Sequence, residues 1–362
     1  MPKQTYSSPL DRVESFTQRL GMRLPILLAP MAGACPPSLS IAVADAGGLG
    51  ACGALLMTPD EIAGWANEVR AKSNGGFQMN LWIPDPPPDR DAEGEARQRE
   101  FLRAWGPPVP PEAGDPKLPV FDDQCQALLA AKPKAVSSIM GLYATGFVSE
   151  LKANEILWFA TVTTAAEARA AEEAGADVIV AQGAEAGGHR GAFDAKVAER
   201  EAVGLMALLP QVVDSVTIPV IATGGLAESR AVAAALTLGA SAVQIGTGLL
   251  RTPEAKLHPA YADQIAKAEA HETMITRAFT GRPGRSISNA YGRASADGPP
   301  PAPYPVQRGL TARMRQEAQQ EGDVERMQMW AGQAARFARA EPAGTVVQQL
   351  WDGALTVLKS PR

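Results

Sequence analysis

The stretch VIVAQGAEAGGHRG, residues 178–191, joins a strand-like segment to a loop of small residues that carries one histidine. Its first four residues are apolar and suit a strand buried on both faces, as in a parallel sheet. The loop then leads through Gln182 and Glu185 to His189, one of three histidines in the chain. The apolar run therefore predicts a parallel α/β fold. Because glycine lets the backbone approach a ligand closely, we expect this strand to end at a ligand.

Alternating strand and helix patterns extend from this stretch in both directions. The expected strands span residues 24–31, 49–56, 77–83, 135–140, 156–162, 177–182, 219–223 and 242–245. The expected helices between them span residues 38–46, 59–70, 122–131, 148–153, 163–174, 203–213 and 228–238. Short apolar runs bounded by glycine or proline indicate the strands, and capping residues indicate the helix ends. Eight strands that alternate with helices predict a TIM-type (β/α)8 barrel rather than an open doubly wound sheet.

Two parts of the chain depart from this rhythm. Residues 84–119 are dense in proline around a charged, helix-like piece at 92–104, and we expect an insertion that lies over the barrel mouth and shapes it. The barrel domain is expected to end at residue 255, and residues 256–362 to form a helical extension that packs on it. Helices are expected at 257–277, twice within 310–339 and at 345–358, with a connector rich in glycine, proline and arginine at 280–305. The packing is expected to bury three aromatic side chains, Trp330, Phe337 and Trp351.

The composition excludes several classes of function. The chain has 362 residues, a net charge of -5 and no cluster of basic residues, which argues against nucleic-acid binding. Its three cysteines form no CxxC pair, so we expect a reducing cytoplasm, no disulfide and no metal site. Neither a signal peptide at the N-terminus nor an uninterrupted membrane-spanning segment is expected, and the sequence is compatible with a monomer or a homodimer.

Two glycine-rich loops follow the last two expected strands. They read ATGGL at residues 222–226 and GTGLL at 246–250. In a TIM barrel these are the positions at which phosphate groups commonly bind, and a helix that begins near Glu228 would add the positive end of its dipole. A glycine after a strand is often only a turn, but both loops together predict a phosphorylated ligand.

Other strand ends supply groups for the organic part of such a ligand. Ala29, Pro30 and Met31 end the first strand and would place backbone against a flat ring, while Asn80 and Gln182 interrupt apolar strands. A single buried amide is usually a satisfied core group, whereas several that converge at one end of a barrel predict a site.

His189 is the candidate catalytic residue, because a neutral imidazole with a pKa near ~6.5 is suited to moving a proton at neutral pH. The alternative is a structural histidine bonded to the backbone, which is the commoner situation. We expect His258 and His271 at the surface, Glu185 as a group that orients His189 or its loop or as a solvated carboxylate, and Arg190 in a structural role.

The motifs LAPM, FQMNLW, AQGAEAGGHRG, ATGG, QIGTGLL, TGRPGR and WAGQAARFAR together resemble those of the nitronate monooxygenases, most closely class I. This resemblance implies a TIM barrel that binds FMN without a covalent bond. It implies that flavin-binding positions are occupied by Asn80, Gln182, Gly187, the adjacent Gly188, Gly224, Gly225, Gln244, Gly246 and Thr247. His189 matches the catalytic histidine, and the segment from Trp330 to Gln333 matches one that helps to close the flavin pocket.

The resemblance also implies an activity. Members of the family oxidise alkyl nitronates such as propionate 3-nitronate with O2, and produce a carbonyl compound and nitrite or nitrate. The chain differs from the family pattern at residues 137–143, SSIMGLY, and at Ala312, where a lysine would be expected. Two alternatives stay open: an NAD(P)H-dependent flavin reductase acting on quinones or enoyl thioesters, and a flavin-free barrel that binds a phosphorylated ligand.

Overall fold

Eight parallel strands form the barrel predicted from the sequence, in a computed structural model that describes residues 8–360. The strands are β1 (Ile26–Leu28), β2 (Gly50–Gly53), β3 (Phe77–Trp82), β4 (Ala135–Ile139), β5 (Leu157–Val162), β6 (Val178–Gln182), β8 (Val220–Thr223) and β9 (Ala242–Ile245). They pair in the order β1-β9-β8-β6-β5-β4-β3-β2. A parallel bridge between Leu27 and Leu49, directly before β2, joins the two ends of the sheet. The TIM-type fold is confirmed.

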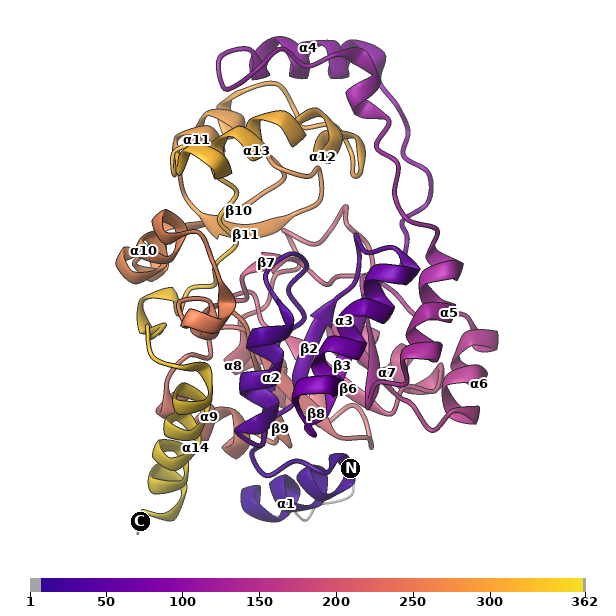
Figure 1. Ribbon diagram of the computed structural model, residues 1–362, viewed down its shortest axis with the longest axis vertical. Helices are drawn as coiled ribbons and strands as arrows, with labels where there is room; N and C mark the ends of the chain where they lie inside the picture. Colours follow the sequence, from indigo (N-terminus) through magenta and orange to yellow (C-terminus); the bar gives the residue numbers. More distant parts are fainter. Residues whose placement is uncertain (1–7, 361–362) are drawn as a thin grey trace.

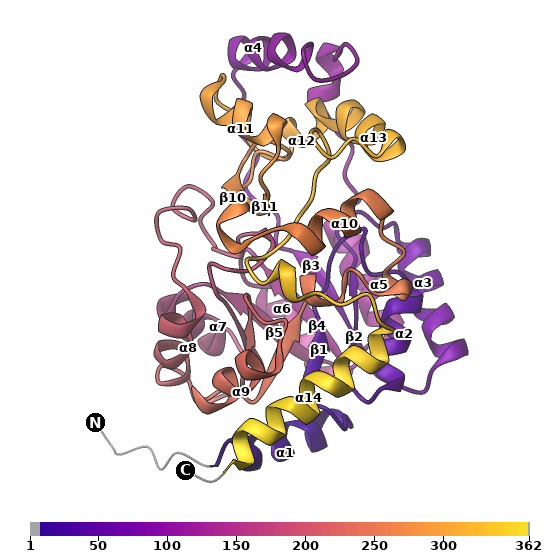
Figure 2. The same cartoon turned by 90° about the vertical axis from the view of Figure 1, so that its left-hand side faces the viewer.

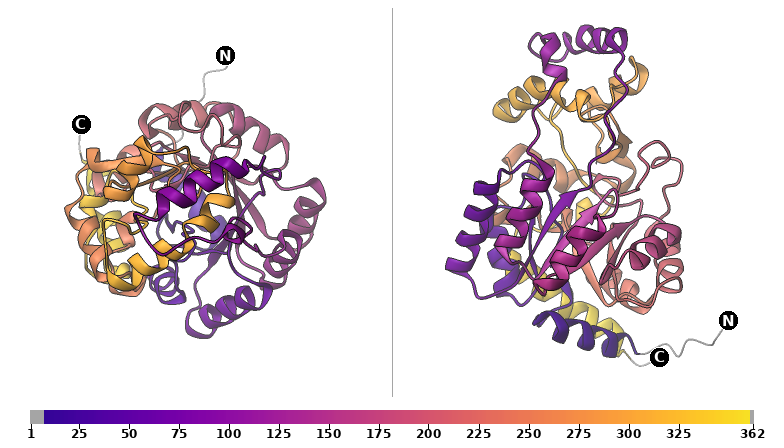
Figure 3. Two further views of the ribbon diagram at one scale, coloured as in Figure 1. Left: turned by 90° about the horizontal axis from the view of Figure 1, so that it is seen from above. Right: turned by 90° about the vertical axis from the view of Figure 1, so that its right-hand side faces the viewer.

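A ring of helices surrounds the strands (Figure 3, left). These are α2 (Pro37–Asp45), α3 (Pro59–Lys72), α5 (Phe121–Ala131), α6 (Thr145–Ala153), α7 (Ala165–Glu173), α8 (Leu205–Val213) and α9 (Ser229–Thr237). The caps expected from the sequence set their starts: in α3 the Thr58 hydroxyl accepts from the Glu61 N–H, and the Glu61 carboxylate accepts from the Thr58 N–H. Successive side chains along a strand point to opposite faces, so the apolar core has two parts. In β1, Ile26 and Leu28 face the helices, whereas Leu27 faces the barrel interior.

One helix, α1 (Pro9–Leu20), is absent from the sequence-based prediction. Its buried residues Phe16 and Leu20 pack with Leu27, Phe159 and Ile221 inside the barrel. Figure 1 shows α1 across the lower end of the barrel. The Ser8 side chain caps this helix. The expectation that the N-terminus is not a signal peptide concerns a segment that begins with residues 1–7, which lie outside the described range.

The extension contains a small sheet where the sequence predicts a helix and a connector. Helix α10 (Pro259–Lys267) ends ten residues before the expected limit at residue 277, and β10 (Thr273–Thr276) follows it. The expected connector forms β11 (Gly284–Ile287) and α11 (Ala290–Asp297). Strand β11 pairs in antiparallel fashion with β10 and with β7 (Gly188–His189), which belongs to the loop after β6. Pairing between distant segments therefore overrides the local helical pattern.

Two helices were predicted within residues 310–339, but this part of the extension holds one α-helix of ten residues. After the short α12 (Val306–Leu310), helix α13 (Ala312–Glu321) stops at Gly322, which has a positive φ of 69°. The chain beyond it is irregular, and the expectation that Phe337 is buried is wrong, because its side chain is 49% exposed. Helix α14 (Ala343–Lys359) returns to the barrel and lies along α9 and α2 (Figure 2).

The proline-rich insertion lies on the extension rather than on the barrel. Its helix α4 (Ala92–Leu102) stands beyond α11, α12 and α13 as seen from the strands (Figures 1 and 3). Leu102 packs with Tyr291 and Leu310, and Gln98 Nε2 donates to the Pro300 carbonyl oxygen at 2.9 Å. Seen from above, the insertion lies across the barrel (Figure 3, left), but the extension lies between the two, and no residue of 84–119 lines the cavity at the strand ends.

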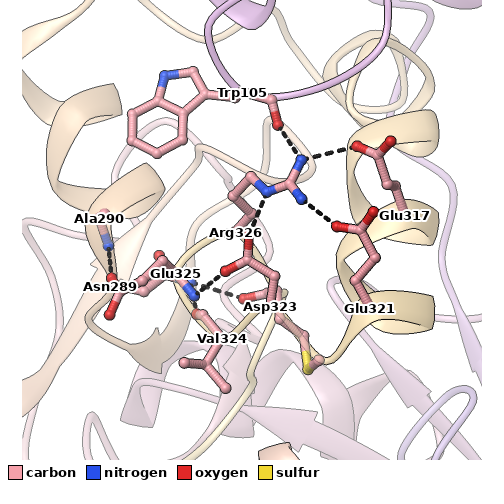
Figure 4. Close-up of polar contacts among 10 residues, drawn as sticks. Trp105, Asn289, Ala290, Glu317, Glu321, Asp323, Val324, Glu325 and Arg326 are labelled. Carbon is pink, nitrogen blue, oxygen red and sulfur yellow. Dashed lines mark hydrogen bonds and ion pairs between the residues drawn. The ribbon is translucent and has the colours of Figure 1, made fainter.

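Arg326 fastens the insertion to the extension (Figure 4). Its guanidinium donates to the Trp105 carbonyl oxygen at 2.8 Å, and it pairs with Glu317 at 2.8 Å, Glu321 at 2.7 Å and Asp323 at 2.6 Å. Trp105 belongs to the insertion, whereas both glutamates lie on α13. One side chain therefore holds α13 and the insertion in a fixed relation.

No helix between residues 8 and 360 combines the length and the apolar character needed to cross a lipid bilayer. Cys35, Cys52 and Cys125 are all buried free thiols.

Candidate functional site

A cavity of 790 Å³ opens at the carboxyl ends of the barrel strands. This volume lies within the range of about 300–1,000 Å³ that small-molecule sites occupy. The cavity brings together all of the predicted site residues except Gln333. These are Ala29, Pro30, Met31, Asn80, Gln182, Gly187, Gly188, His189, Gly224, Gly225, Gln244, Gly246, Thr247 and Trp330.

The two glycine-rich loops offer unused backbone donors. Gly224 and Gly225 have φ values of 108° and 70°, a region that favours glycine. Within residues 8–360, neither their N–H groups nor that of Gly246 makes a hydrogen bond to the protein. At the start of α9 the Glu228 carboxylate accepts from Arg230 N and Ala231 N, so these two N–H groups are already engaged. Free backbone N–H groups are thus the donors available for a phosphate.

Two buried amides present one unused end each to the cavity. Asn80 Nδ2 donates to the Ser137 carbonyl oxygen at 3.1 Å and to its hydroxyl at 3.0 Å, which fixes the amide and leaves Oδ1 as an acceptor. Gln244 Oε1 accepts from Gln78 Nε2 at 2.8 Å, which leaves Gln244 Nε2 as a donor. Sequence reasoning missed Gln78, which lies below the cavity and orients Gln244.

Gln182 lines the cavity and also forms hydrogen bonds within the loop that follows β6. Its Nε2 donates to the His189 carbonyl oxygen at 3.1 Å, and its Oε1 accepts from the Gly191 N–H at 2.8 Å. Both ends of the amide are therefore engaged with the loop. Although Gln182 lines the cavity, its hydrogen bonds hold the backbone of His189 in place.

The imidazole of His189 lies between two indoles. Its ring centroid is 4.5 Å from that of Trp82 and 4.8 Å from that of Trp330. Its Nε2 lies 2.8 Å from the Thr280 hydroxyl oxygen, and its backbone pairs with Gly284 of β11. The histidine is thus held by the extension as much as by the barrel.

His189 is neutral at physiological pH. Burial, and then the positive charges of Arg282, Arg308 and Arg315, lower its pKa to about 3. Such an imidazole is a weak base. It can still form hydrogen bonds, and because it is neutral it does not repel an anion that lies beside it.

The segment around Trp330 closes one side of the cavity. The Gly332 N–H donates to the Thr247 hydroxyl at 3.0 Å, and the Gln333 N–H donates to the Glu185 carbonyl oxygen at 2.9 Å. A Cβ on Gly187 would come within 2.5 Å of the Gly332 nitrogen, so the two loops touch through glycine backbone. The Gln333 side chain does not line the cavity, and its Nε2 donates to the Ala270 carbonyl oxygen at 3.3 Å.

Four further residues have clear positions. The Glu185 carboxylate accepts from the Leu205 N–H at 2.9 Å at the start of α8, and so orients the loop rather than His189. Arg190 is structural, since its guanidinium donates to the Gly183 carbonyl oxygen at 2.7 Å. His271 is exposed, whereas His258 is partly buried and caps α10 by accepting from the Ala260 N–H.

Several lining residues were not predicted from the sequence: Trp82 lies within the FQMNLW motif on β3, and the others belong to segments far from the barrel motifs. They are Trp82, Thr280, Tyr304, Arg308 and Arg315. The TGRPGR motif that contains Thr280 was the available signal, whereas nothing in the sequence marks the two arginines. Of the unusual stretch 137–143 only Ile139 lines the cavity, and Ala312 lines it on α13.

Known proteins resemble this chain over nearly its whole length. The family model described as nitronate monooxygenase matches residues 14–353. Proteins named "Probable nitronate monooxygenase" from Staphylococcus aureus strains Newman and MSSA476 are each 33% identical over 343 residues, covering 92% of this chain and 95% of the relative. A solved nitroalkane oxidase from Streptomyces ansochromogenes is 34% identical with a TM-score of 0.86, over 95% of this chain and 100% of that one. FabK from Thermotoga maritima is 28% identical with a TM-score of 0.73, over 95% and 97%.

Proposed function

This chain belongs to the nitronate monooxygenase family, and on that premise we propose that it oxidises small alkyl nitronates with O2 by means of bound FMN. Its general chemistry is the oxidation of nitro compounds by an oxidoreductase. The proposed substrates are nitronates of the propionate 3-nitronate type. The proposed products are a carbonyl compound and nitrite or nitrate.

The cavity fits a flavin mononucleotide by the chemistry of its donors. The free N–H groups of Gly224, Gly225 and Gly246 match a phosphate, with Thr247 beside them. Ala29, Pro30 and Met31, which follow β1, line the cavity and would lie against the flat ring of the flavin. When bound, FMN supplies the one-electron transfer between the nitronate and O2.

The observation that carries this proposal is a neutral His189 in a cavity whose lining, within residues 8–360, contains no aspartate or glutamate. An anionic nitronate therefore meets no repulsive charge there. The imidazole and the two indoles around it position the nitronate and exclude water. Because a base with a pKa of about 3 removes protons poorly at pH 7, we expect an already ionised nitronate to react far better than a neutral nitroalkane.

Oxygen consumption tests this proposal directly. Purified protein loaded with FMN is mixed with propionate 3-nitronate, and with the corresponding neutral nitro compound, in the absence of any nicotinamide. We expect rapid O2 uptake only with the nitronate. If NADH instead bleaches the flavin rapidly under anaerobic conditions and no nitronate is consumed, the reductase alternative replaces this proposal.

Colour tests the cofactor separately. A preparation without flavin absorbance, even after incubation with FMN, would favour the flavin-free phosphate-binding barrel. The contact between the Thr247 hydroxyl and the Gly332 N–H predicts that FMN binding also orders the extension, so the cofactor should protect the 330–334 segment from proteolysis.

We also propose a cytoplasmic location, on the basis of the free cysteines, and a monomer or homodimer as the assembly state.

We propose two units, residues 1–255 and 256–362, which share the active site. Separate expression of the first unit should therefore yield a protein that binds FMN poorly. Sedimentation of the full chain tests the assembly state.

A further inference from the structure

The side chain of Gln78 lies inside the barrel, below the cavity at the strand ends. It is fully buried and faces the barrel interior, because its neighbours on β3, Phe77 and Met79, face the helices. The apolar side chains of this interior include Leu27 and Phe159. Gln78 does not line the cavity, so any effect that it has on a ligand there must pass through another residue.

The amide of Gln78 has one fixed orientation. Its Nε2 donates to the Leu28 carbonyl oxygen at 3.1 Å and to Gln244 Oε1 at 2.8 Å. A carbonyl oxygen can only accept a hydrogen bond, so the end of the amide that faces Leu28 must be the nitrogen. The Gln78 Oε1 has no hydrogen-bond partner within residues 8–360. A buried acceptor without a partner is unfavourable, so the stability of the barrel does not account for this amide.

The fixed amide of Gln78 decides which end of the Gln244 amide faces the cavity. Because Gln78 offers an N–H group, Gln244 turns its Oε1 toward that group, and its Nε2 is left at the cavity end. Within residues 8–360 this nitrogen donates to no acceptor, although Gln244 lines the cavity. Without Gln78, the two ends of the Gln244 amide could exchange by rotation about one bond. Gln78 therefore makes Gln244 a donor.

The amide of Asn80 is fixed in the same way, with the opposite result. Two oxygens of Ser137 hold its Nδ2, and its Oδ1 is left as an acceptor for the cavity. Ser137 belongs to the stretch 137–143, which differs from the family pattern, and the Tyr143 hydroxyl donates to its carbonyl oxygen at 3.1 Å. Side chains that do not line the cavity thus set one lining amide as an acceptor and the other as a donor.

We propose that Gln78 is a positioning residue that keeps Gln244 as a hydrogen-bond donor to the ring of bound FMN, and that it raises the reduction potential of the flavin in this way. The ring gains negative charge when it is reduced. A donor that is already oriented stabilises this charge more than it stabilises the neutral, oxidised ring. The inference rests on the proposed function, in which the nitronate reduces FMN.

The reduction potential of bound FMN tests the inference without any substrate. Gln78→Met nearly keeps the volume of the side chain and removes both polar ends of the amide. Because Gln244 then loses its fixed orientation, the ratio of the affinities for reduced and oxidised FMN should fall about 10-fold. For a two-electron couple this change corresponds to a potential about 30 mV lower, measured against a reference dye in anaerobic solution.

A double-mutant cycle distinguishes positioning from a general effect on the fold. Gln244→Met should lower the potential at least as much as Gln78→Met does. In the Gln244→Met background, Gln78→Met should cause no further change, because Gln78 acts only through Gln244. Gln78→Glu serves if the methionine variant does not fold. As a buried neutral acid it offers one O–H group in place of two N–H groups, so its potential should lie between those of the wild type and Gln244→Met.

Gln98→Met is the matched control. Gln98 is also a fully buried glutamine, and its Nε2 donates to the Pro300 carbonyl oxygen at 2.9 Å, but it lies on α4 in the insertion. The variant should leave the potential of bound FMN unchanged, even if it lowers Tm. An unchanged potential in Gln78→Met, or a further fall when it is added to Gln244→Met, would overturn the inference. An equal shift in Gln98→Met would overturn it as well.

Nitronate oxidation is measured separately, by oxygen uptake. If the expected pattern of potentials is found but no nitronate is oxidised, the proposed function fails while the role of Gln78 stands. If the wild type oxidises nitronates but the cycle shows no coupling between Gln78 and Gln244, only this inference fails. A wild-type protein that binds no FMN would overturn both.

Discussion

The Nε2 atom of His189 lies 2.8 Å from the hydroxyl oxygen of Thr280, although the two residues are 91 positions apart in the chain. His189 follows a barrel strand, whereas Thr280 lies between β10 and β11 in the extension. The candidate active site is therefore completed only when the extension docks on the barrel.

Thr280 should orient the imidazole through its hydroxyl. Thr280→Val keeps the shape of the side chain and removes the hydrogen bond, which is worth about 1 kcal/mol, so kcat/KM for nitronate should fall about 5-fold. Thr280→Ser retains the hydroxyl and should behave as the wild type. Steady-state oxygen uptake measures both; equal activity of the valine and serine variants would show that the contact does not matter for turnover.

His189 itself should matter for turnover and not for the flavin. In His189→Asn a shorter amide replaces the imidazole, and loss of a hydrogen bond to an anion should lower kcat/KM about 10- to 100-fold. The flavin content, measured by absorbance, should stay at the wild-type level. Unchanged turnover would remove His189 from the mechanism.

The depressed pKa of His189 also predicts a pH dependence of stability. The unfolded state takes up a proton near pH ~6.5, but the folded state does so only near pH 3. Between these values the unfolded state binds more protons, so the free energy of unfolding falls as the pH is lowered, by at most about 1.4 kcal/mol per pH unit from this group. Urea denaturation of the flavin-free protein at pH 7 and pH 4.5 should show a smaller loss in His189→Asn than in the wild type. The same loss in both would contradict the neutral, buried imidazole.

Gly224 should be required for the phosphate loop. Alanine at its φ of 108° is strained by about 1–3 kcal/mol, and its Cβ would lie 3.1 Å from the Ala186 nitrogen. Gly224→Ala should therefore weaken FMN binding, measured by quenching of flavin fluorescence during titration of the flavin-free protein. Gly64→Ala is the matched control, because Gly64 lies on the exposed face of α3 with open space around it; it should leave FMN affinity unchanged. An unaffected Kd in Gly224→Ala would mean that the loop does not hold the phosphate.

Arg326 should stabilise the extension without contributing to chemistry. Arg326→Gln removes the ion pairs with α13 and leaves the Trp105 carbonyl oxygen short of a donor, a loss of about 1–3 kcal/mol. Thermal unfolding of the FMN-loaded protein should show a lower Tm, with kcat at 20–25 °C close to that of the wild type. Arg293→Gln, at an exposed pair with Glu325, should leave Tm almost unchanged. Similar Tm values for the two variants would contradict the fastening role of Arg326.

The sequence by itself determined the barrel, its glycine-rich loops and the position of His189 at a strand end. Each depends on a pattern within a short segment: apolar runs for strands, capping residues for helices, and glycine where the backbone takes a positive φ. Such signals can be recognised in the amino-acid sequence, because each is produced by residues that are neighbours in the chain.

The tertiary structure alone decided what surrounds His189. The pairing of β7 with β11, the Thr280 contact and the position of Arg308 join segments separated by about a hundred residues, and no local pattern encodes which distant segments will meet. For the same reason the expected helix at 257–277 gave way partly to a strand, and the insertion came to rest on the extension. The charge and shape of the cavity thus follow from long-range packing, whereas the frame that supports it follows from local sequence.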